Sequence, residues 1–342
     1  MKEYEMKEDS VVLQSEKITT EPLYSEWFAV KDSLLFCFNP RKTDCAYYVF
    51  NIRTGKLIGN FLPYGHGNNE FIALPPILRF DQEGNETKTF LYAPAEGKVF
   101  TWNISQSIQQ KKTVIEDVRK FPAAPHNALF FSRVTRISKD SVLAYTPSIS
   151  SLTEARVILP QYYVLGNDPY EILSEIKIVK ENPDPDQYPA LMADEYFAGP
   201  SCTKPDGSKF VQAMRWFPQL NIVDIASGKV HSYRMKNADG SSSFEISKTD
   251  PIHHYHEVVA NEKYIFALWG GATKKTFKGN CHEIHIFDWE GRFLKRIYLK
   301  EPANSIWFDD STQMLYAYSM ENESLLRYDL TQVPDLRLSR NK

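Results

Sequence analysis

Short runs of aromatic and β-branched residues, separated by turn residues, recur along the whole chain, and no long stretch has the period of an amphipathic helix. The clearest run, residues 47–58, reads as a strand ending in Asn51, a tight turn containing Gly55, and a second strand. Asx side chains cap such turns and glycine supplies a positive φ, so the pattern predicts a β-hairpin.

This hairpin motif recurs along the chain, with some copies truncated or looser. The six copies lie at residues 47–58, 99–103, 162–168, 220–230, 284–294 and 325–330. A strand precedes each copy, at residues 34–38, 90–93, 142–145, 209–214, 264–269 and 314–318. An innermost strand is expected before each of these, at residues 27–30, 77–80, 130–137, 195–199, 255–260 and 305–308. Repeated four-stranded units are typical of propeller blades. We therefore expect an all-β fold, a six-bladed β-propeller, with residues 1–342 forming one domain.

The last predicted blade lacks its outer strand, because only a C-terminal tail, residues 331–342, follows its third strand. The run at residues 11–18, within an N-terminal segment of residues 1–20, belongs to no blade of its own. Pairing this run beside residues 325–330 would close the ring and remove two exposed sheet edges. We therefore expect an N-terminal strand to complete the last blade.

Composition supports a folded β protein: 42% of residues are hydrophobic and 13% aromatic. The formal net charge is −3 and the basic residues are scattered, whereas a nucleic-acid binder needs a basic footprint. No apolar run is long enough to span a bilayer. The first five residues are polar and lack the apolar region of a signal peptide, so the protein is either cytosolic or has lost a leader.

The four cysteines, Cys37, Cys45, Cys202 and Cys281, have no C-x-x-C spacing. We expect buried free thiols, with a contact between Cys37 and Cys45 across one hairpin as the alternative. We expect a monomer without cofactor or metal.

Long loops on a rigid scaffold are where binding residues concentrate. The longest predicted connections, at residues 62–72, 119–127, 180–190, 237–251 and 270–281, fall on one face of the propeller. Six residues with hydrogen-bonding groups or ring faces lie in or beside connections on that face. These candidates are His66, His126, Arg215, Trp216, His254 and Trp269. They suit a polar ligand with some planar or sugar-like surface, although interblade packing is an equal reading for Trp216 and the better one for Trp269.

Three motifs have the composition of a metal or phosphate site, but a structural role explains each of them more simply. The histidines at residues 253–256, with His282 and His285, could hold zinc, but no carboxylate or cysteine stands at ligand spacing. Strand alternation would place His254 and His256 on one face. The Gly-rich loop at residues 65–70 lacks a P-loop context, so a turn in which Glu70 caps backbone amides is expected. The acidic, proline-rich stretch at residues 182–186 reads as a stiff loop, not as a calcium site.

Residues 264–268, 286–291, 315–319 and 328–330 resemble the TolB-like six-bladed propeller family of mostly uncharacterised bacterial lipoproteins. The loop at residues 65–71 looks like that group's Gly-x-Gly-Pro-x-Glu-Phe loop, with Asn68 where proline is usual. The resemblance implies a leader with a lipidated cysteine, and hence a periplasmic or outer-membrane location. Neither feature is present in this chain, so membrane association would depend on that anchor alone.

No nucleophile elbow of the G-x-S-x-G type occurs. We therefore expect a non-catalytic binding or scaffold module of the cell envelope, with a protein, peptide or glycan as ligand. The alternative is a propeller enzyme, a carbohydrate lyase or hydrolase, with histidine and arginine at the mouth of the channel. A deep polar pocket would favour the enzyme, whereas a flat, aromatic-rimmed face would favour binding.

Overall fold

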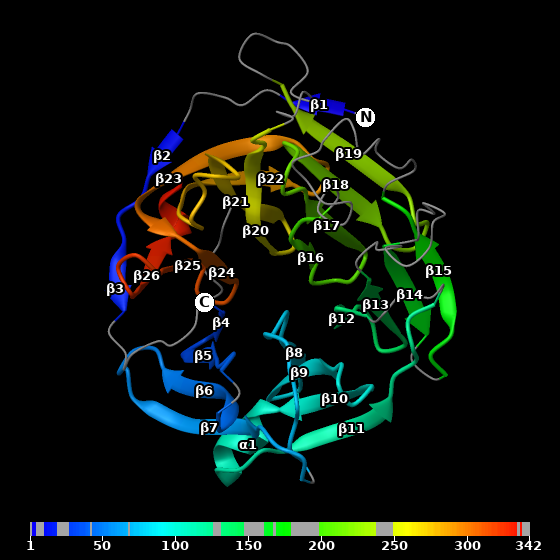
Figure 1. Cartoon of the computed structure of the whole chain (residues 1–342). Coiled ribbons are helices and arrows are strands. Elements are labelled where there is room, and N and C mark those ends of the chain that lie inside the picture. Colours follow the sequence, from blue (N-terminus) through cyan, green and yellow to red (C-terminus); the bar gives the residue numbers. More distant parts are fainter. Residues whose placement is uncertain are drawn as a thin grey trace. The chain divides into compact units, whose positions relative to one another are not determined.

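The computed structural model describes residues 2–4, 10–18, 27–41, 43–67, 69–125, 131–146, 161–166, 169–178, 198–236, 249–333 and 336. The chain divides into two compact units. Unit 1 comprises Met1–Glu16, Pro147–Gln161 and Ser174–Lys342, and unit 2 comprises Lys17–Thr146 and Tyr162–Leu173. The described residues form six sheets (Figure 1). Five of them contain four strands that are consecutive in the chain, and the sixth contains three consecutive strands and one N-terminal strand. The prediction of an all-β, six-bladed propeller is confirmed, whereas the prediction that residues 1–342 form one domain stays a prediction.

The blades of unit 2 follow the chain in order, from innermost to outermost strand. The first contains β4 (Phe28–Lys31), β5 (Leu34–Phe38), β6 (Cys45–Asn51) and β7 (Leu57–Pro63). The second contains β8 (Asp81–Glu83), β9 (Glu86–Ala93), β10 (Lys98–Asn103) and β11 (Ile115–Lys120), with α1 (Ile104–Gln110) before β11. The third contains β12 (Arg133–Arg136), β13 (Ser141–Tyr145), β14 (Tyr162–Gly166) and β15 (Ile172–Ile176), of which residues 174–176 are counted with unit 1.

Unit 1 contributes the other three blades. The fourth contains β16 (Ser201–Thr203), β17 (Lys209–Ala213), β18 (Gln219–Asp224) and β19 (Val230–Met235). The fifth contains β20 (Ile252–Ala260), β21 (Tyr264–Thr273), β22 (Cys281–Asp288) and β23 (Phe293–Ala303). The last contains β24 (Ser305–Asp309), β25 (Met314–Ser319) and β26 (Ser324–Asp329), followed by the short 3₁₀ helix η1 (Leu330–Gln332).

Three short N-terminal strands, β1 (Lys2–Tyr4), β2 (Ser10–Val12) and β3 (Glu16–Ile18), add to the outer edges of these blades. Strand β3 lies beside β26, which confirms the predicted completion of the last blade. Arg327 of β26 binds the Glu16 carboxylate there at 2.7 Å. The predicted run is nevertheless divided, because Val11 and Val12 pair in parallel with β23 instead. Strand β1 adds in the same way to β19.

The hairpin turns follow the mechanism expected from their sequences. The Asn51 side chain accepts hydrogen bonds from two backbone amides of its turn, each at 3.0 Å, and Gly55 has φ +68°. In the β18–β19 turn, Asp224 accepts from the Ser227 amide at 2.9 Å. The repeated Asx residue therefore shapes each of these two turns by replacing backbone hydrogen bonds.

Blade strands are apolar on both faces because neighbouring sheets pack against both. In β21 the five residues 264–268 are all buried. Phe266 of this strand stacks on Phe308 of β24, with ring centroids 4.9 Å apart. A continuous apolar run therefore marks a sheet enclosed between two others in unit 1.

Several predicted elements are wrong in position. The innermost strand expected at residues 77–80 is β8, which begins only at Asp81. Of the strand expected at residues 195–199, residues 195–197 lie outside the described part of the chain, and the innermost strand described in that blade, β16, begins at Ser201. The first four residues of the loop expected at 270–281 prolong β21 instead. In the expected C-terminal tail, η1 leads into Val333, which is buried.

Helix α1 was not expected at all. Its N-cap is Asn103, whose side chain accepts a hydrogen bond from the Gln106 amide at 3.0 Å. Asn followed three residues later by Gln is the pattern of a capping box. A seven-residue helix is too short to produce a visible hydrophobic period, so this cap was its only sequence signature.

The cysteines behave largely as expected. Cys37, Cys45 and Cys281 are buried free thiols, and Cys202 is free but half-buried. The contact considered between Cys37 and Cys45 is wrong, because Cys37 pairs with Tyr48 and Cys45 with Pro63.

Candidate functional site

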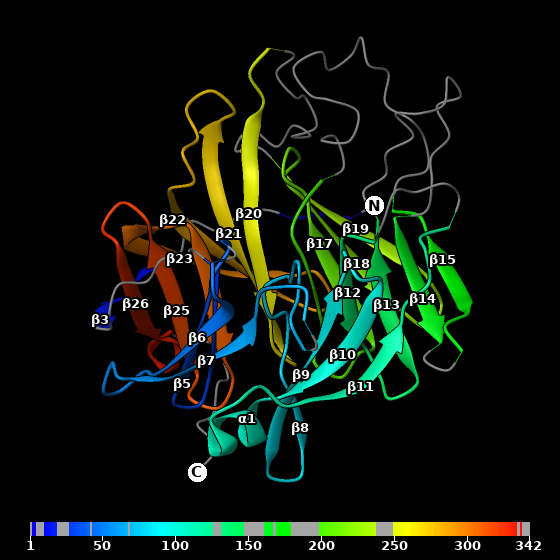
Figure 2. The same ribbon diagram turned by 60° about the horizontal axis from the view of Figure 1, so that its bottom comes forward.

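The β20–β21 hairpin extends beyond the neighbouring strands of its sheet (Figure 2). Its ladder has register shifts between His253 and Tyr255 and between Tyr255 and Glu257. Bulges of this kind bend a strand and redirect its side chains, and they are common beside functional sites. Here the bulges interrupt the alternation of side chains between the two faces of the strand along residues 253–256.

The redirection changes which rings lie together. His253 stacks on Phe277 with ring centroids 3.9 Å apart, and His256 meets the same phenyl ring at 5.2 Å. His254 instead contacts Trp269, at 4.8 Å. The expectation that His254 and His256 share a face is therefore wrong, because the bulges interrupt the two-residue period on which it depended.

The loop between β17 and β18 brings Arg215 and Trp216 to this hairpin. Arg215 is held through its backbone, since its carbonyl accepts from the His254 amide at 2.6 Å. Trp216 meets His253 edge-on at 5.3 Å. The Lys274 ammonium also lies near Trp216, 5.5 Å from the centroid of its ring. We call this group the imidazole cluster. Its members are Arg215, Trp216, His253, His254, His256, Lys274 and Phe277.

Two glycines make room for the cluster. A Cβ on Gly270 would lie 2.7 Å from both the Nδ1 atom and the carbonyl oxygen of His253. Gly271 has φ +68°, and a Cβ there would lie 2.7 Å from the indole nitrogen of Trp269. Since contacts this short do not occur between real atoms, side chains at these two positions would displace the rings.

The imidazoles are neutral at pH 7. Burial, together with smaller effects of the neighbouring His256, Arg215 and His254, lowers the pKa of His253 to about 3. Burial, with a smaller contribution from His285, lowers the pKa of His254 to about 3. Burial and the Arg215 charge lower the pKa of His256 to about 4. Neutral rings each offer one donor and one acceptor nitrogen, and so behave as hydrogen-bonding groups and not as charges.

Four buried ring nitrogens of this cluster have no hydrogen-bond partner in the part of the chain that the structure describes. They are Nδ1 of His253, His254 and His256 and Nε1 of Trp216. Buried polar atoms are nearly always paired, because leaving one unpaired costs about 1–3 kcal/mol. Their concentration around one hairpin makes the cluster a candidate binding site.

A buried chain of hydrogen-bonding groups continues from the cluster toward the N-terminus. Trp269 stacks on His285 at 4.9 Å, and His285 Nδ1 lies 3.4 Å from the Tyr255 hydroxyl. That hydroxyl shares a 3.0 Å hydrogen bond with the hydroxyl of Tyr4 in β1. Strand β1 thus holds the Tyr255 side chain directly and the Trp269 side chain through Tyr255 and His285.

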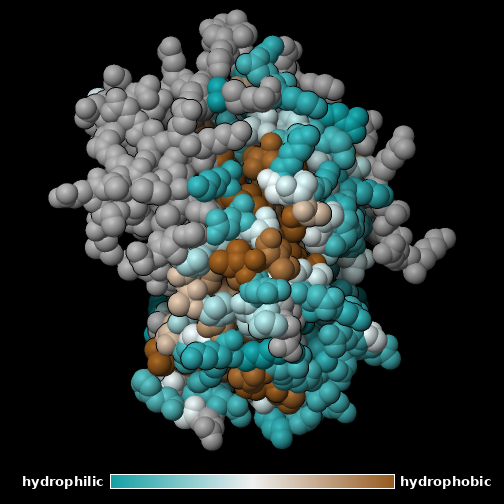
Figure 3. All heavy atoms as spheres, turned by 90° about the vertical axis from the view of Figure 1, so that its right-hand side faces the viewer, coloured by the Kyte–Doolittle hydropathy of each residue, from teal (hydrophilic) through white to brown (hydrophobic). Residues whose placement is uncertain are grey.

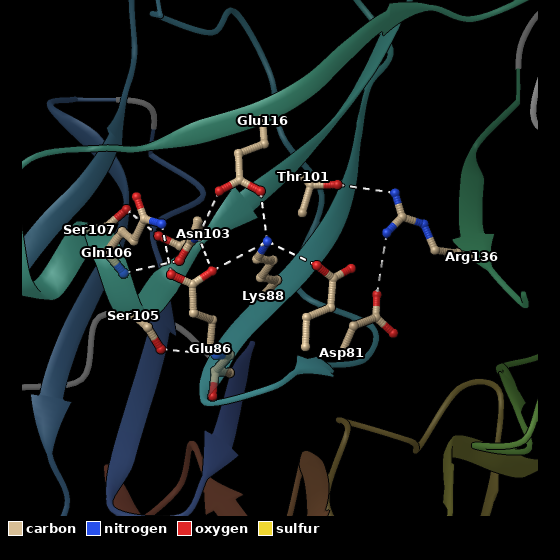
Figure 4. A network of polar contacts seen from close by, with 12 residues as sticks. Asp81, Glu86, Lys88, Thr101, Asn103, Ser105, Gln106, Ser107, Glu116 and Arg136 are labelled. Atoms are coloured by element: carbon tan, nitrogen blue, oxygen red, sulfur yellow. Dashed lines mark hydrogen bonds and ion pairs between the residues drawn. The ribbon is translucent and has the colours of Figure 1, made fainter. Parts of the chain in front are cut away.

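Unit 2 holds a polar group of a different kind, which we call the Lys88 network (Figure 4). The Lys88 ammonium lies 2.8 Å from Glu116, 2.9 Å from Glu83 and 3.4 Å from Glu86. Asn103 donates to Glu86 at 3.0 Å and to Glu116 at 2.7 Å. Hydrogen bonds and the Lys88 charge lower the pKa of the Glu86 and Glu116 carboxyls. The network therefore binds strands β8 to β11 together, with Lys88 paired to all three carboxylates.

A shallow hollow of about 460 Å³ also lies in unit 2. Its lining residues are Arg119, Lys139, Asp140, Gly166, Pro169, Glu171 and Leu173. Two cationic and two anionic side chains contribute to it, so it has no marked preference for one sign of charge.

The six residues predicted from the sequence are divided by the structure. Arg215, Trp216 and His254 lie in the imidazole cluster, and Trp269 borders it through its contact with His254. These four assignments stay predictions. His66 lies exposed in unit 2, in a turn where Glu70 accepts from the Gly67 amide at 2.8 Å, as expected for a capping role. His126 lies outside the described residues, as does the acidic, proline-rich stretch at 182–186.

The sequence-based candidates omitted four members of the cluster: His253, His256, Lys274 and Phe277. The two histidines were visible as a group, but strict alternation gave no reason to place them beside a phenyl ring. Phe277 and Lys274 follow the end of β21. The sequence there has no strand or helix periodicity from which their neighbours could be predicted. Within the described residues, no group of three or more metal-ligating side chains is assembled. In the same part of the chain, no helix is long and apolar enough to cross a membrane.

Comparison with known proteins places the chain by its fold. A Bacteroides vulgatus protein of the DUF4221 family matches with a TM-score of 0.57 at 11% identity, over 94% of this chain and 98% of that one. A Bacteroides fragilis protein whose name marks it as a candidate for export matches with a TM-score of 0.51 at 14% identity, over 96% of this chain and 98% of that one. No family model and no curated protein sequence matches. The comparisons support the propeller class and leave the TolB-like resemblance and its lipoprotein leader as predictions.

Proposed function

We propose that this protein is a non-catalytic binding module that acts outside the cytoplasm and takes its ligand at the imidazole cluster of unit 1. The observation that carries the proposal is the set of four buried ring nitrogens without a partner in the described residues. A group that only stabilised the fold would have its polar atoms paired, as the Lys88 network has. The extracytoplasmic location is supported by the name of the similar Bacteroides fragilis protein. A lipid anchor, and a monomeric state, remain part of the proposal.

The cluster has the composition of a binding site. Aromatic rings provide planar walls, and a few fixed polar groups among them determine how a ligand is oriented. Trp and Arg, which dominate binding energies at many interfaces, stand next to each other at residues 215 and 216. The fourth and fifth blades of unit 1 carry them, with Arg215 and Trp216 between β17 and β18 and the others on or just after β20 and β21. Because blades are rigid, little entropy is lost when a ligand is fixed.

Substitution of single residues tests this assignment. The wild-type protein is screened against an array of neutral and acidic oligosaccharides and against a phage-displayed peptide library. We expect Arg215→Gln and His256→Gln to weaken the binding of any captured probe at least tenfold. Lys31→Ala combined with Asp32→Ala, in the β4–β5 turn of unit 2, is the control and should leave affinity unchanged. Equal loss in both sets, or loss in the control alone, would contradict the proposed site.

The choice of variants follows from burial. Trp216 is only 5% exposed, so it is not the exposed side chain that a sequence-based test would assume. Trp216→Ala would leave a cavity in the fold and would confuse instability with lost binding. Trp216→Phe keeps most of the ring and removes the indole N–H, which makes it the sharper substitution.

An enzymatic role is the second candidate, because neutral imidazoles beside an arginine can accept a proton; their lowered pKa makes them weak bases, which is why binding is the first. A carbohydrate lyase or hydrolase would use one imidazole of the cluster as the base. Incubation with the same oligosaccharides, followed by mass spectrometry, distinguishes the two functions. Shortened products that vanish in His256→Gln would establish the enzyme, whereas unchanged masses with retained binding support the binding module.

A further inference from the structure

We infer that strand β1 (Lys2–Tyr4) is an autoinhibitory latch of the imidazole cluster, a role that rests on the proposed function and adds the regulation of the same site. Docked on β19, β1 keeps the cluster closed, and its release opens the cluster to a ligand. The four unpaired ring nitrogens of the cluster are buried. A ligand therefore reaches them only if the surrounding side chains move.

The cluster lies between two neighbouring blades of unit 1. Arg215 and Trp216 come from the loop between β17 and β18 of the fourth blade, and the histidines come from β20 of the fifth. The edge-on contact of Trp216 with His253, at 5.3 Å between ring centroids, joins the two sides. A small separation of the blades would expose the ring nitrogens while each blade keeps its own hydrogen-bonded strands.

Tyr4 ties these same two blades together. Strand β1 extends the sheet of the fourth blade by pairing in parallel with β19 (Figure 1). The Tyr4 ring crosses to the fifth blade, where it stacks on Phe293 at 5.9 Å and meets Phe287 edge-on at 5.2 Å. Tyr4 belongs to an apolar cluster with residues of both blades, and Trp269 packs against that cluster. The space that Tyr4 fills is thus continuous with the surroundings of the imidazole cluster.

The Tyr4 hydroxyl also reaches the strand that carries the histidines. It shares its 3.0 Å hydrogen bond with Tyr255, which is fully buried. Tyr255 stands between His254 and His256 in the sequence and between the two register shifts of the β20–β21 ladder. A bulge disrupts the ladder locally, so side-chain contacts help to fix the position of such a segment. The bond from Tyr4 therefore sets the placement of both neighbouring histidines.

Release of β1 would change the surroundings of Tyr255. Its hydroxyl would keep only the longer contact that the structure gives it, 3.4 Å to Nδ1 of His285. A buried hydroxyl that loses its closer partner is costly unless the segment moves or water enters. Either change opens the path to the ring nitrogens. Because coupling between two sites is reciprocal, a molecule bound at these nitrogens would in turn disfavour the docking of β1.

The contacts that hold β1 are few enough for it to detach alone. Within this three-residue strand only Tyr4 is buried. The Lys2 ammonium lies 6.0 Å from the centroid of the Tyr233 ring, and the Glu3 carboxylate lies 3.6 Å from the Lys236 ammonium. Contacts between exposed charges contribute little. Short terminal strands of this kind open at low free energy, before the blades that they cover.

Diethyl pyrocarbonate tests the latch without a ligand, because it acylates neutral imidazoles that solvent can reach. Mass spectrometry of peptides locates the label. In the wild-type protein the three cluster histidines should react about tenfold more slowly than the exposed His66 and His231, which serve as internal references. Deleting residues 1–4 should raise the cluster rate about tenfold, and Tyr4→Phe, which removes only the hydroxyl, about fivefold.

Two matched variants separate the latch from a general loss of stability. Tyr48→Phe removes a hydroxyl that donates to Asp44 at 2.7 Å in unit 2, and it should leave the cluster rate unchanged. Leu13→Ala removes a buried side chain of the same N-terminal segment, next to β2, at the edge of the fifth blade opposite to β20. It should lower the melting temperature without raising the cluster rate. Circular dichroism confirms that each variant is folded.

The outcomes distinguish the latch from the proposed function. An unchanged cluster rate after the deletion, or an equal rise in Leu13→Ala, would overturn the latch. On the oligosaccharide array the deletion should be captured about tenfold more tightly than the wild-type protein. Capture that Arg215→Gln weakens but the deletion leaves unchanged would support the binding site and overturn the latch. Faster labelling after the deletion, with no capture of either form, would support the latch as a gate to the cluster and contradict the binding module.

Discussion

The imidazole cluster of unit 1 and the Lys88 network of unit 2 are both concentrations of polar side chains within apolar sheets, but they differ in how these groups are paired. Around Lys88, three carboxylates share one ammonium and two amides complete their hydrogen bonds. In the cluster, burial keeps the imidazoles neutral and four ring nitrogens have no partner among the described residues. Single unpaired buried atoms, such as Gln313 Oε1 and Ser324 Oγ, occur elsewhere in the described residues. Pairing stabilises a fold, whereas four unpaired ring nitrogens around one hairpin indicate a role that the fold alone does not explain.

The edges of the two units differ as well. In unit 1, β1 and β2 cover the outer edges of β19 and β23. In unit 2, no described strand lies beyond β7, β11 or β15. Figure 3 shows apolar side chains reaching the surface on one side of the molecule. On the outer strands β11 and β15, Val118, Ile172 and Leu173 are exposed. The N-terminal segment therefore protects one set of edges and leaves another open.

Deleting residues 1–18 should have the largest effect on this comparison, since it gives unit 1 the open edges of unit 2. The deletion removes three strands and the buried side chains of Tyr4, Leu13 and Ile18. We expect a loss of about 5 kcal/mol in the free energy of unfolding, measured by urea denaturation. Tyr4→Phe, which removes only the hydroxyl bonded to Tyr255, should cost about 1 kcal/mol. An unchanged midpoint after the deletion would show that the N-terminal strands do not stabilise the blades.

Lys88→Met should have the next largest effect, because it converts the paired network into an unpaired one. Three carboxylates would remain together without their cation, but they are one-third to more than half exposed. Solvent screens such groups, so we expect a cost of about 1 kcal/mol. The pKa of Glu86 and Glu116 is lowered in the folded protein, so their contribution is present above pH 4.5 and is lost as the pH falls through the lowered values. The variant should lose this acid dependence. Lys56→Met, at an exposed turn, is the control, and equal denaturation midpoints for the two variants would refute the role of the network.

The smallest effect is expected in the titration of the cluster. A histidine with a lowered pKa in the folded state stabilises that state fully above its unfolded pKa of about 6.5. The contribution is lost as the pH falls toward the folded values of about 3 to 4. NMR of the imidazole nitrogens should therefore show His253, His254 and His256 still neutral at about pH 5.5. Protonation with midpoints near 6.5 would mean that these rings are open to water and would weaken the comparison with the Lys88 network.

Much of the fold could be predicted because its information is local. The Asx–Gly turns and apolar runs locate β5 within Leu34–Phe38 to the residue, and the unpaired last blade indicated the position of β3. The innermost strands β8 and β16 were misplaced because each has only three residues and no clear alternation. The pairing of β1 and β2 with β19 and β23 depends on contacts across more than two hundred residues, which a linear pattern does not encode.

The candidate site was predictable only in part. Arg215, Trp216 and His254 could be chosen by chemistry, since arginine and tryptophan dominate many binding interfaces and histidine offers hydrogen-bonding nitrogens. These three residues meet His256 and Phe277 only because β20 has two bulges, and no residue type in that strand predicts a bulge. The neutral state of the rings depends on burial, which only the folded chain determines.

The threading of β1, β2 and β3 onto three successive blades has a mechanical consequence. A pull on the N-terminus reaches these short strands in turn, so each one must detach before the next carries the load. Tyr4, stacked against Phe293 and bonded to Tyr255, is the first buried side chain to meet that force. A protein attached to a surface through this end would therefore yield in small steps and dissipate tension while its blades stay folded.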